Sequence, residues 1–331
     1  MRKLATIRKI TAVSEHTNAD RLAIYTVDGW KVIDQKGRYE VGDTVIYCEI
    51  DSFLPIKPEF EFLRKSSFKK MGEKEGFRLK TIRLRGELSQ GLLISPDVLP
   101  SDFEQKEKGE DVSELLGIVK YDPPIPANLA GTAKGYFPSF IPKTDEERIQ
   151  NIPFENLIEH TYTVTEKLDG SSMTVFVNEG EIGVCSRNLE LLEDERNSLW
   201  SIVKQYDLKT KLKNLGRNLA LQGELVGLGV QKNIYKLPQI DFRIFKVWDI
   251  DKHQYLDIAD AQILAESLGL QTVPILEKGY RLPENVEDAL LFADAKSTLS
   301  DANREGVVLY AETDQSVHFK IISNRFLEKE K

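Results

Sequence analysis

Residues 4–94 contain short stretches in which apolar and polar residues alternate, separated by residues that favour turns. Such alternation predicts half-buried strands, and Asp28-Gly29 and Arg85-Gly86 are typical turn sequences. The predicted strands are Leu4–Ile10, Leu22–Val27, Lys31–Ile33, Thr44–Glu49, Leu79–Leu84 and Gly91–Ile94. So many short strands in so few residues predict a small closed β-barrel, for which an OB-like barrel is the leading candidate.

The pattern changes after residue 118, where strand-like alternation gives way to residues that favour irregular backbone. These residues are Pro123, Pro124, Pro126, Gly131, Gly135, Pro138 and Pro142. Their composition predicts a linker over 119–142, between a first domain at 1–118 and a second domain at 143–331.

The second domain mixes strand-like and helix-like segments. Helical character is found in Lys143–Leu157, Leu199–Asn218, Ala259–Leu268 and Val286–Ala295. Strands are predicted over Thr161–Glu166, Met173–Val177, Ile182–Ser186, Ala220–Leu225, Phe242–Ile250, Gly306–Leu309 and Val317–Ile321. Strands and helices do not alternate regularly, so the pattern indicates an α+β fold.

The composition is that of an ordinary globular protein. Of 331 residues, 41% are hydrophobic, which is enough apolar material for two domain cores. Two distant cysteines, Cys48 and Cys185, exclude a disulfide framework and a cysteine-based zinc site. The sequence contains neither an apolar stretch of the ~20 residues that cross a membrane nor the apolar core of a secretion signal. We therefore expect a soluble, cytoplasmic protein, and we expect it to be a monomer.

Charge is unevenly distributed along the chain. The net charge of −8 argues weakly against a nucleic-acid partner. However, residues 64–85 hold nine basic residues and two acidic ones, hence a net +7, with aromatic residues between them. This combination suits contacts to phosphates and bases, whereas the alternative is a solvated charged loop. The predicted nucleic-acid contacts are Arg64, Lys65, Lys69, Lys70, Arg83 and Arg85.

The segment Glu166-Lys167-Leu168-Asp169-Gly170 places a lysine where a predicted strand ends and a turn begins. A lysine nucleophile must lose its proton, so partial burial or a nearby cation has to lower its pKa. Taken alone, the segment favours an exposed hairpin turn with a solvated lysine. Five later segments change this interpretation, namely Cys185-Ser186-Arg187-Asn188, Gln222–Gly227, Phe242–Ile250, Arg304–Leu309 and His318–Ser323.

In this order, the six segments resemble the motifs of covalent nucleotidyltransferases, the superfamily of DNA ligases, RNA ligases and mRNA capping enzymes. The resemblance covers about residues 140–331, and Pro142–Asn151 is similar to an RNA ligase segment. Only Ile321–Lys331 follows the last motif and the barrel lies upstream, as in RNA ligase family five, the clade with an N-terminal OB domain. The resemblance implies a second domain of antiparallel sheets with flanking helices.

The resemblance also implies an activity. An ATP-dependent RNA ligase would join 3′-hydroxyl and 5′-phosphate ends, most readily at nicks in RNA-containing duplexes. It would act through a lysyl-AMP and an adenylylated 5′-phosphate, with Mg²⁺ or Mn²⁺ as metal. The alternatives are a DNA ligase, a GTP-using capping-type transferase, or a non-catalytic nucleic-acid-binding protein whose site has decayed. The presence of Lys167, Glu224, Glu305 and Lys320 argues against decay.

The residues that the resemblance assigns fall into three groups. Lys167 would be the nucleophile, and Lys320 and Glu224 further catalytic residues. Hard oxygen ligands for the metal would come from Glu224 and Glu305, with Asp169 third. The nucleotide-binding residues would be Glu166, Arg187, Glu224, Phe245 or Trp248, Val307, Lys320 and Arg148.

Two of these assignments carry open alternatives. Arg148 is equally consistent with a solvated helix residue that pairs with Asp145 or Glu146. His318 stands where many RNA ligases have a second lysine, and we expect it to be a plain strand residue.

Overall fold

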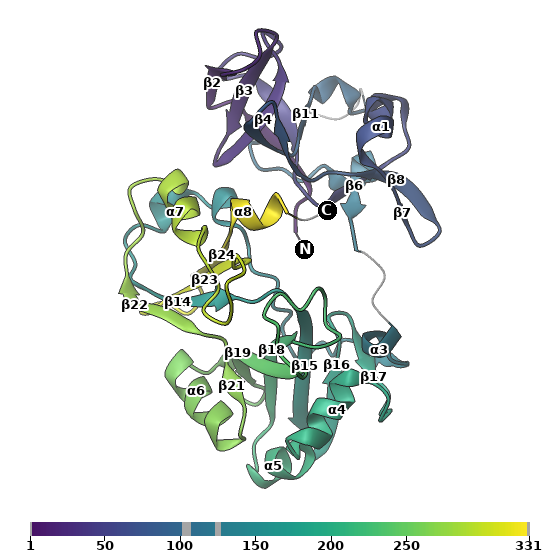
Figure 1. Ribbon diagram of the computed structural model, residues 1–331, viewed down its shortest axis with the longest axis vertical. Helices are drawn as coiled ribbons and strands as arrows, with labels where there is room; N and C mark the ends of the chain where they lie inside the picture. Colours follow the sequence, from purple (N-terminus) through teal and green to yellow (C-terminus); the bar gives the residue numbers. More distant parts are fainter. Residues whose placement is uncertain (1, 101–106, 123–126, 330–331) are drawn as a thin grey trace. The chain divides into compact units, whose positions relative to one another are not determined.

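The computed structural model describes residues 2–100, 107–122 and 127–329 (Figure 1). The chain forms two units. The first comprises the described parts of Met1–Pro124, Ile149–Pro153 and Leu327–Lys331, and the second comprises those of Ile125–Arg148 and Phe154–Phe326. The chain therefore passes between the units more than once.

The first unit consists mainly of short antiparallel strands in the orders β1-β5-β11, β2-β3-β4, β10-β9 and β12-β6-β8-β7. Their bounds are β1 Ala5–Lys9, β2 Ala12–Glu15, β3 Leu22–Val27, β4 Trp30–Gln35, β5 Thr44–Cys48, β6 Ser52–Pro55, β7 Phe68–Met71, β8 Lys74–Arg78, β9 Thr81–Leu84, β10 Glu87–Gln90, β11 Leu92–Ile94 and β12 Val119–Lys120. Short helical turns are η1 Pro58–Leu63, α1 Arg64–Ser67, η2 Pro96–Val98 and α2 Ser113–Leu116. Alternation explains the strands best in β3, where every second residue is buried.

Six strands of the first unit, β2, β6, β7, β8, β10 and β12, have no counterpart in the predicted pattern. All four residues of β2 are exposed, so this strand carries no apolar alternation. The hairpin β7–β8 is largely polar, and its strands are held by backbone pairing. Strands β6 and β10 are four residues each. Such strands are not predicted from hydrophobic periodicity, because backbone hydrogen bonds between strands define them and alternating side chains do not.

The second unit contains two sheets, β13-β17-β16-β15-β18-β19-β20 with β21 beside β19, and β22-β14-β23-β24. The strands are β13 Ala133–Tyr136, β14 Tyr162–Lys167, β15 Ser171–Asn178, β16 Glu181–Cys185, β17 Leu189–Leu191, β18 Leu219–Val226, β19 Asp241–Asp249, β20 Gln254–Tyr255, β21 Gln271–Thr272, β22 Ile275–Tyr280, β23 Gly306–Ala311 and β24 His318–Ile322. The helices and turns are α3 Ala127–Ala130, η3 Ile149–Asn151 (in the first unit), η4 Phe154–Asn156, α4 Ser198–Gln205, α5 Leu208–Asn214, α6 Ile258–Ser267, α7 Val286–Ala293 and α8 Asn324–Leu327. Pairing is antiparallel except between β19 and β21, which confirms the predicted α+β class with antiparallel sheets.

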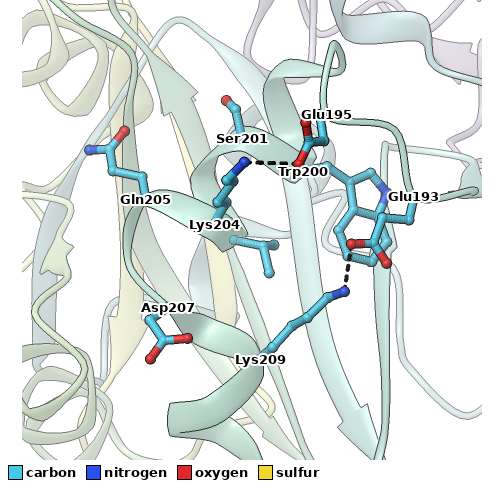
Figure 2. A pocket seen from close by; sticks show the side chains of 9 residues that line it. Glu193, Glu195, Trp200, Ser201, Lys204, Gln205, Asp207 and Lys209 are labelled. Atoms are coloured by element: carbon cyan, nitrogen blue, oxygen red, sulfur yellow. Dashed lines mark hydrogen bonds and ion pairs between the residues drawn. The ribbon is translucent and has the colours of Figure 1, made fainter.

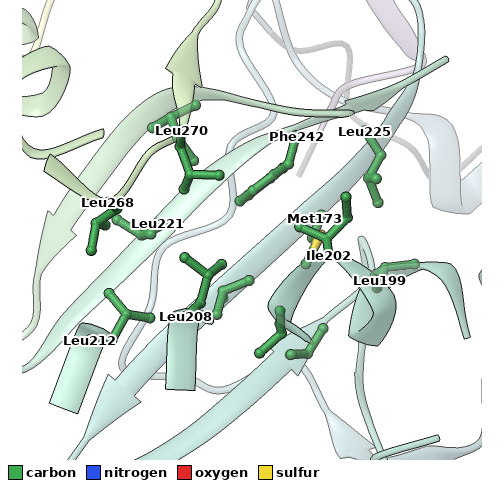
Figure 3. Close-up of a cluster of buried hydrophobic side chains, with 14 of the residues drawn as sticks. Met173, Leu199, Ile202, Leu208, Leu212, Leu221, Leu225, Phe242, Leu268 and Leu270 are labelled. Atoms are coloured by element: carbon green, nitrogen blue, oxygen red, sulfur yellow. The ribbon is translucent and has the colours of Figure 1, made fainter. Parts of the chain in front are cut away.

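The main core of the second unit lies between the larger sheet and helices α4, α5 and α6 (Figure 3). Alternate residues of β15 and β18, among them Met173 and Leu221, are fully buried there against Leu208 and Leu212 of α5. The opposite side chains of β18, including Glu224, therefore lie on the other face of the sheet. One face of the sheet supplies stability and leaves the other for chemistry.

The prediction of a single helix over Leu199–Asn218 is wrong, because the structure has α4 and α5 instead. The break falls at Asp207, whose φ of 50° is left-handed and cannot continue a right-handed helix. The α4 helix is begun by Asn197, whose side chain accepts hydrogen bonds from the N–H groups of Leu199 and Trp200.

The prediction of a helix over Lys143–Leu157 is also wrong. Only the short turns η3 and η4 form there. Ile149 and Gln150 are buried and belong to the first unit, and Pro153 has no N–H for a helical hydrogen bond. Within 119–142, where a linker was predicted, the described residues include β12, α3 and β13; residues 123–126 lie outside the described residues.

Candidate active site

The candidate nucleophile Lys167 is the last residue of β14, where the strand leaves the core. Its Nζ lies 2.8 Å from the carboxylate of Glu305, and 27% of its side chain is exposed. The two residues meet because Lys167 pairs with Gly306, the first residue of β23. A Cβ at Gly306 would lie 2.1 Å from the carbonyl oxygen of Ile321, so only glycine allows β24 to approach there.

The turn after Lys167 lies directly against β18. Leu168 is buried, and a Cβ at Gly170 would lie 2.1 Å from the carbonyl oxygen of Leu225. The same Cβ would lie 2.8 Å from Cγ of Glu224. Glycine at this position thus brings the nucleophile segment beside the Glu224 carboxylate.

The charges of Lys167 and the nearby carboxyl groups change one another's pKa. Burial acts to lower the pKa of Lys167, but the carboxylates of Glu305 and Glu224 outweigh it and raise that pKa above its usual value. Burial, together with repulsion from Glu305 and Asp169, raises the pKa of Glu224 to about 8 despite the attraction of Lys167. The ligand-free site therefore holds a protonated lysine among more carboxyl groups than one lysine can neutralise.

This donor set has the chemistry that a divalent cation requires, because Glu224, Glu305 and Asp169 all offer hard oxygens. Within the described part of the chain, however, no three His, Cys, Asp or Glu side chains converge into a preformed metal cluster. The residues therefore fit a hydrated Mg²⁺ or Mn²⁺ that they contact through water better than a fully protein-ligated ion.

Two further predicted residues, Arg148 and Lys320, lie side by side. Lys320 of β24 donates its backbone N–H to the carbonyl oxygen of Glu147 at 2.8 Å and forms a parallel bridge with Arg148. Arg148 is 4% exposed, so it is not a solvated helix residue. Asp145 pairs with Arg187 at 2.7 Å, and Glu146 pairs with Lys246.

A buried charge cluster that the sequence analysis did not assign lies in the same unit. Lys246 of β19 contacts Glu146 at 2.7 Å, and both side chains are less than a tenth exposed. Glu146 also bonds to His318, which is thus a partner of a carboxylate and not merely a strand residue. Nζ of Lys246 lies 4.7 Å and 5.1 Å from the ring centres of Tyr255 and Tyr310. The signal in the sequence is a lysine within the apolar and aromatic run 244–248 of β19.

The two candidate adenine-stacking residues differ in their surroundings. The indole N–H of Trp248 donates to the carbonyl oxygen of Phe140 at 3.0 Å, and its ring packs 4.9 Å from that of Tyr255. Phe245 packs in the cluster that contains Leu168, next to the nucleophile. This placement favours Phe245.

The predicted residues Glu166 and Val307 face each other across β14 and β23. Both are buried, and Glu166 Oε2 accepts hydrogen bonds from the N–H and the hydroxyl of Thr298 at 2.8 Å and 2.7 Å. Its backbone N–H donates to the carbonyl oxygen of Pro274. Glu166 therefore also anchors the segment that contains Thr298.

A cavity of about 540 Å³ lies on the helical side of the second unit, between α4 and the beginning of α5 (Figure 2). Four of its five charged side chains form ion pairs, Lys204 with Glu195 at 2.8 Å and Lys209 with Glu193 at 2.5 Å. None of the predicted site residues lines it. The cavity is therefore not the site of the chemistry considered above.

In the first unit, the six predicted nucleic-acid contacts are all exposed. Three of them have partners: Arg64 pairs with Glu61, Lys70 with Glu75 at 2.8 Å and Arg83 with Glu328 at 2.6 Å. Lys65, Lys69 and Arg85 have no ion-pair partner among the residues that the structure describes. The local charge is thus partly neutralised, but positive groups remain exposed.

The second unit has a lysine at a strand end among carboxylates, and its two antiparallel sheets follow a small β unit. This arrangement resembles that of the covalent nucleotidyltransferases. A family model of an OB-fold domain matches residues 4–96, and an RNA ligase family model matches residues 160–322. The chain belongs to the RNA ligase family, which confirms the family prediction and the predicted OB-like domain.

Solved structures of an RNA ligase from Naegleria gruberi are similar to the whole chain. The structure with PPi is 41% identical, covers 100% of this chain and 99% of its own, and has a TM-score of 0.92. A lysine-to-methionine variant with AMP and Mn (41% identity, TM-score 0.92) and a glutamate-to-alanine variant with ATP and Mn (41% identity, TM-score 0.93) each cover 99% of both chains. A comparison with curated proteins gives no match.

A membrane-spanning helix is not found in the described ranges, where no helix has both the length and the apolar character that crossing a bilayer requires.

Proposed function

We propose that the protein is an ATP-dependent RNA ligase that joins a 3′-hydroxyl end to a 5′-phosphate end by way of a lysyl-AMP on Lys167. The observation that carries the proposal is the position of Lys167, at a strand end, 2.8 Å from Glu305 and against Glu224. The similarity to RNA ligase structures that hold ATP or AMP with Mn supports ATP as nucleotide and a divalent metal as cofactor.

In the first step, the deprotonated Nζ of Lys167 attacks the α-phosphorus of ATP. A nitrogen–phosphorus bond forms, the bond from the α-phosphorus to the bridging oxygen breaks, and pyrophosphate leaves. Nζ of Lys167 donates a hydrogen bond to the carboxylate of Glu305, and the lysine must lose a proton before attack. A bound divalent cation would neutralise Glu224 and Glu305, which removes the charges that raise the pKa of Lys167 and lets burial lower it.

The remaining residues bind and orient the nucleotide. The adjacent Lys320 and Arg148 are suited to neutralise phosphate charge. Phe245 would stack on adenine, while Glu166 would contact the base through its backbone beside Val307. These contacts would hold ATP in one orientation, in which the leaving pyrophosphate lies on the side of the α-phosphorus opposite Lys167.

In the second and third steps, the 5′-phosphate of RNA displaces Lys167 from the AMP, and the 3′-hydroxyl then displaces AMP from the activated phosphate. The exposed Arg187 is suited to the incoming 5′-phosphate. Lys65, Lys69 and the other exposed basic residues of 64–85 would bind the strand backbone. We propose nicked duplexes that contain RNA as substrate and a monomer as the active form.

The deciding experiment incubates the protein with α-labelled ATP or GTP and Mn²⁺, and follows label on the protein. We expect labelling from ATP that is lost in Lys167→Ala and kept in Lys209→Ala, a control lysine that pairs with Glu193 at the cavity of Figure 2. Labelling from GTP alone would instead indicate a capping-type transferase, and no labelling would refute a covalent nucleotidyltransferase. Nicked duplexes with RNA or DNA at the 3′-hydroxyl side then separate RNA ligase from DNA ligase.

A further inference from the structure

We propose that Tyr235 is a positioning residue that fixes the Lys167–Gly170 turn and thereby aims Lys167 at the α-phosphate. The inference rests on the proposed function, because it assumes that Lys167 is the nucleophile. Tyr235 lies in the loop between β18 and β19, residues 227–240, and contributes no charge to the site.

The contact between Tyr235 and the turn is short and part-buried. The phenolic oxygen of Tyr235 accepts the backbone N–H of Asp169 at 2.6 Å, and Tyr235 is 3% exposed. Its ring packs with Leu168 and Val273 in one apolar cluster. The hydrogen bond therefore holds the second residue after the nucleophile against this apolar cluster.

The loop that carries Tyr235 is itself fixed at several points. The side chain of Asn233 both donates to and accepts from the backbone of Leu237, at 3.0 Å and 3.1 Å. The hydroxyl of Ser300 donates to the carbonyl oxygen of Ile234 at 3.1 Å. Gln231 donates through Nε2 to the carbonyl oxygen of Gly170 at 3.2 Å, which is a second contact to the same turn.

The turn is restricted by these loop contacts as well as by β18. A Cβ on Gly170 would already clash with β18, so the turn is bounded there by the carbonyl oxygen of Leu225. Tyr235 and Gln231 bound it from the loop side. Because Lys167 directly precedes the turn, a turn held on both sides limits the positions that Nζ can reach, and in-line attack depends on that position.

The test is Tyr235→Phe, which removes only the hydroxyl that accepts the Asp169 N–H in a part-buried site. We expect the rate constant of protein adenylylation at saturating ATP to fall about tenfold. The ATP concentration for half-maximal rate should be unchanged, because Tyr235 contacts the turn and not the nucleotide. Sealing of an RNA that is already adenylylated at its 5′-phosphate should also be unchanged, since that step does not use Lys167 as nucleophile.

Tyr162→Phe is the matched control. Tyr162 is fully buried in β14, and its hydroxyl donates to the carbonyl oxygen of Leu157 at 2.7 Å. This variant should lose a similar amount of thermal stability without loss of adenylylation rate. Equal rate losses in the two Tyr→Phe variants would overturn the inference, because a merely structural role predicts that result.

A second variant tests the inference if Tyr235→Phe does not fold. Gln231 is exposed, so Gln231→Ala should fold normally, and we expect a two- to threefold lower adenylylation rate. If Tyr235→Phe does not fold, an unchanged rate in Gln231→Ala overturns the inference. A wild-type protein that accepts no label from ATP would refute the proposed function, whereas normal labelling in both loop variants would refute only the positioning role.

Discussion

The buried pair Glu146–Lys246 offers the sharpest test of how the second unit is stabilised. Glu146→Gln keeps the shape of the side chain but removes its charge, which leaves the ammonium of Lys246 in a site where its side chain is 8% exposed. The rings of Tyr255 and Tyr310 remain near Nζ and retain part of the stabilisation. Breaking a buried pair from one side costs about 3–5 kcal/mol, and we expect the lower end, about 3 kcal/mol.

Urea unfolding measures this cost when Glu146→Gln, Lys246→Met and the double variant are compared with the wild type. Removing both charges leaves no unpaired buried ion, so the double variant should be more stable than the less stable single variant. In a thermal scan, the loss of about 3 kcal/mol corresponds to a melting temperature lower by roughly 6–12 °C for a unit of this size. The reasoning is refuted if Glu146→Gln costs less than about 1 kcal/mol or if the two single effects simply add.

The pH dependence gives an independent check. Burial acts to raise the pKa of Glu146, but the hydrogen bond with His318 and the charge of Lys246 outweigh it, and the pKa of Glu146 is lowered. A lowered carboxyl pKa contributes stability that is present above the usual carboxyl value and is lost as pH falls through the folded value. The stability difference between the wild type and Glu146→Gln should therefore shrink as the pH falls below about 4.

Three further predictions concern other features. In Gly170→Ala, the new Cβ would lie 2.1 Å from the carbonyl oxygen of Leu225, so protein labelling by ATP should fall by at least about 100-fold; near-normal labelling would show that the turn can move. Lys65→Ala combined with Lys69→Ala should weaken RNA binding and reduce its salt slope by about two, while labelling by ATP continues. Glu179 has a φ of 51° in the two-residue turn between β15 and β16, so Glu179→Asn should raise the free energy of unfolding by about 0.5–1 kcal/mol, measured as a higher urea midpoint.

The sequence predicts those parts of the molecule whose information is local. Residues Lys167 to Gly170 identify the nucleophile segment because the order strand, lysine and tight turn is contained within a few positions. The strands β3 and β18 are predicted almost to their ends, because each presents its own apolar pattern. The helix break at Asp207 is missed, although the buried residues Leu199 and Val203 of α4 and Leu208 and Leu212 of α5 would lie on opposite faces of one continuous helix.

The parts that could not be predicted depend on pairings between distant residues. Glu146 and Lys246 are 100 positions apart, and neither residue indicates the other before the fold is known. The hydroxyl of Tyr235 reaches the backbone of Asp169 across 66 positions, and a tyrosine in a loop carries no signal of such a contact. A hydrogen bond between a side chain and the backbone does not require a particular residue type at the backbone position. The sequence therefore does not indicate such contacts, and they are the hardest to predict.

The passage of Ile149–Pro153 through the first unit has a consequence for synthesis of the chain. In that unit the indole N–H of Trp30 donates to the side chain of Asn151 at 2.9 Å, and Asn151 donates to the buried carboxylate of Glu49 at 3.1 Å. A ribosome that has released only the N-terminal strands has not yet supplied Asn151. The first unit therefore completes its interior hydrogen bonds only after part of the second unit has been synthesised. It cannot complete its fold before synthesis of the second unit begins.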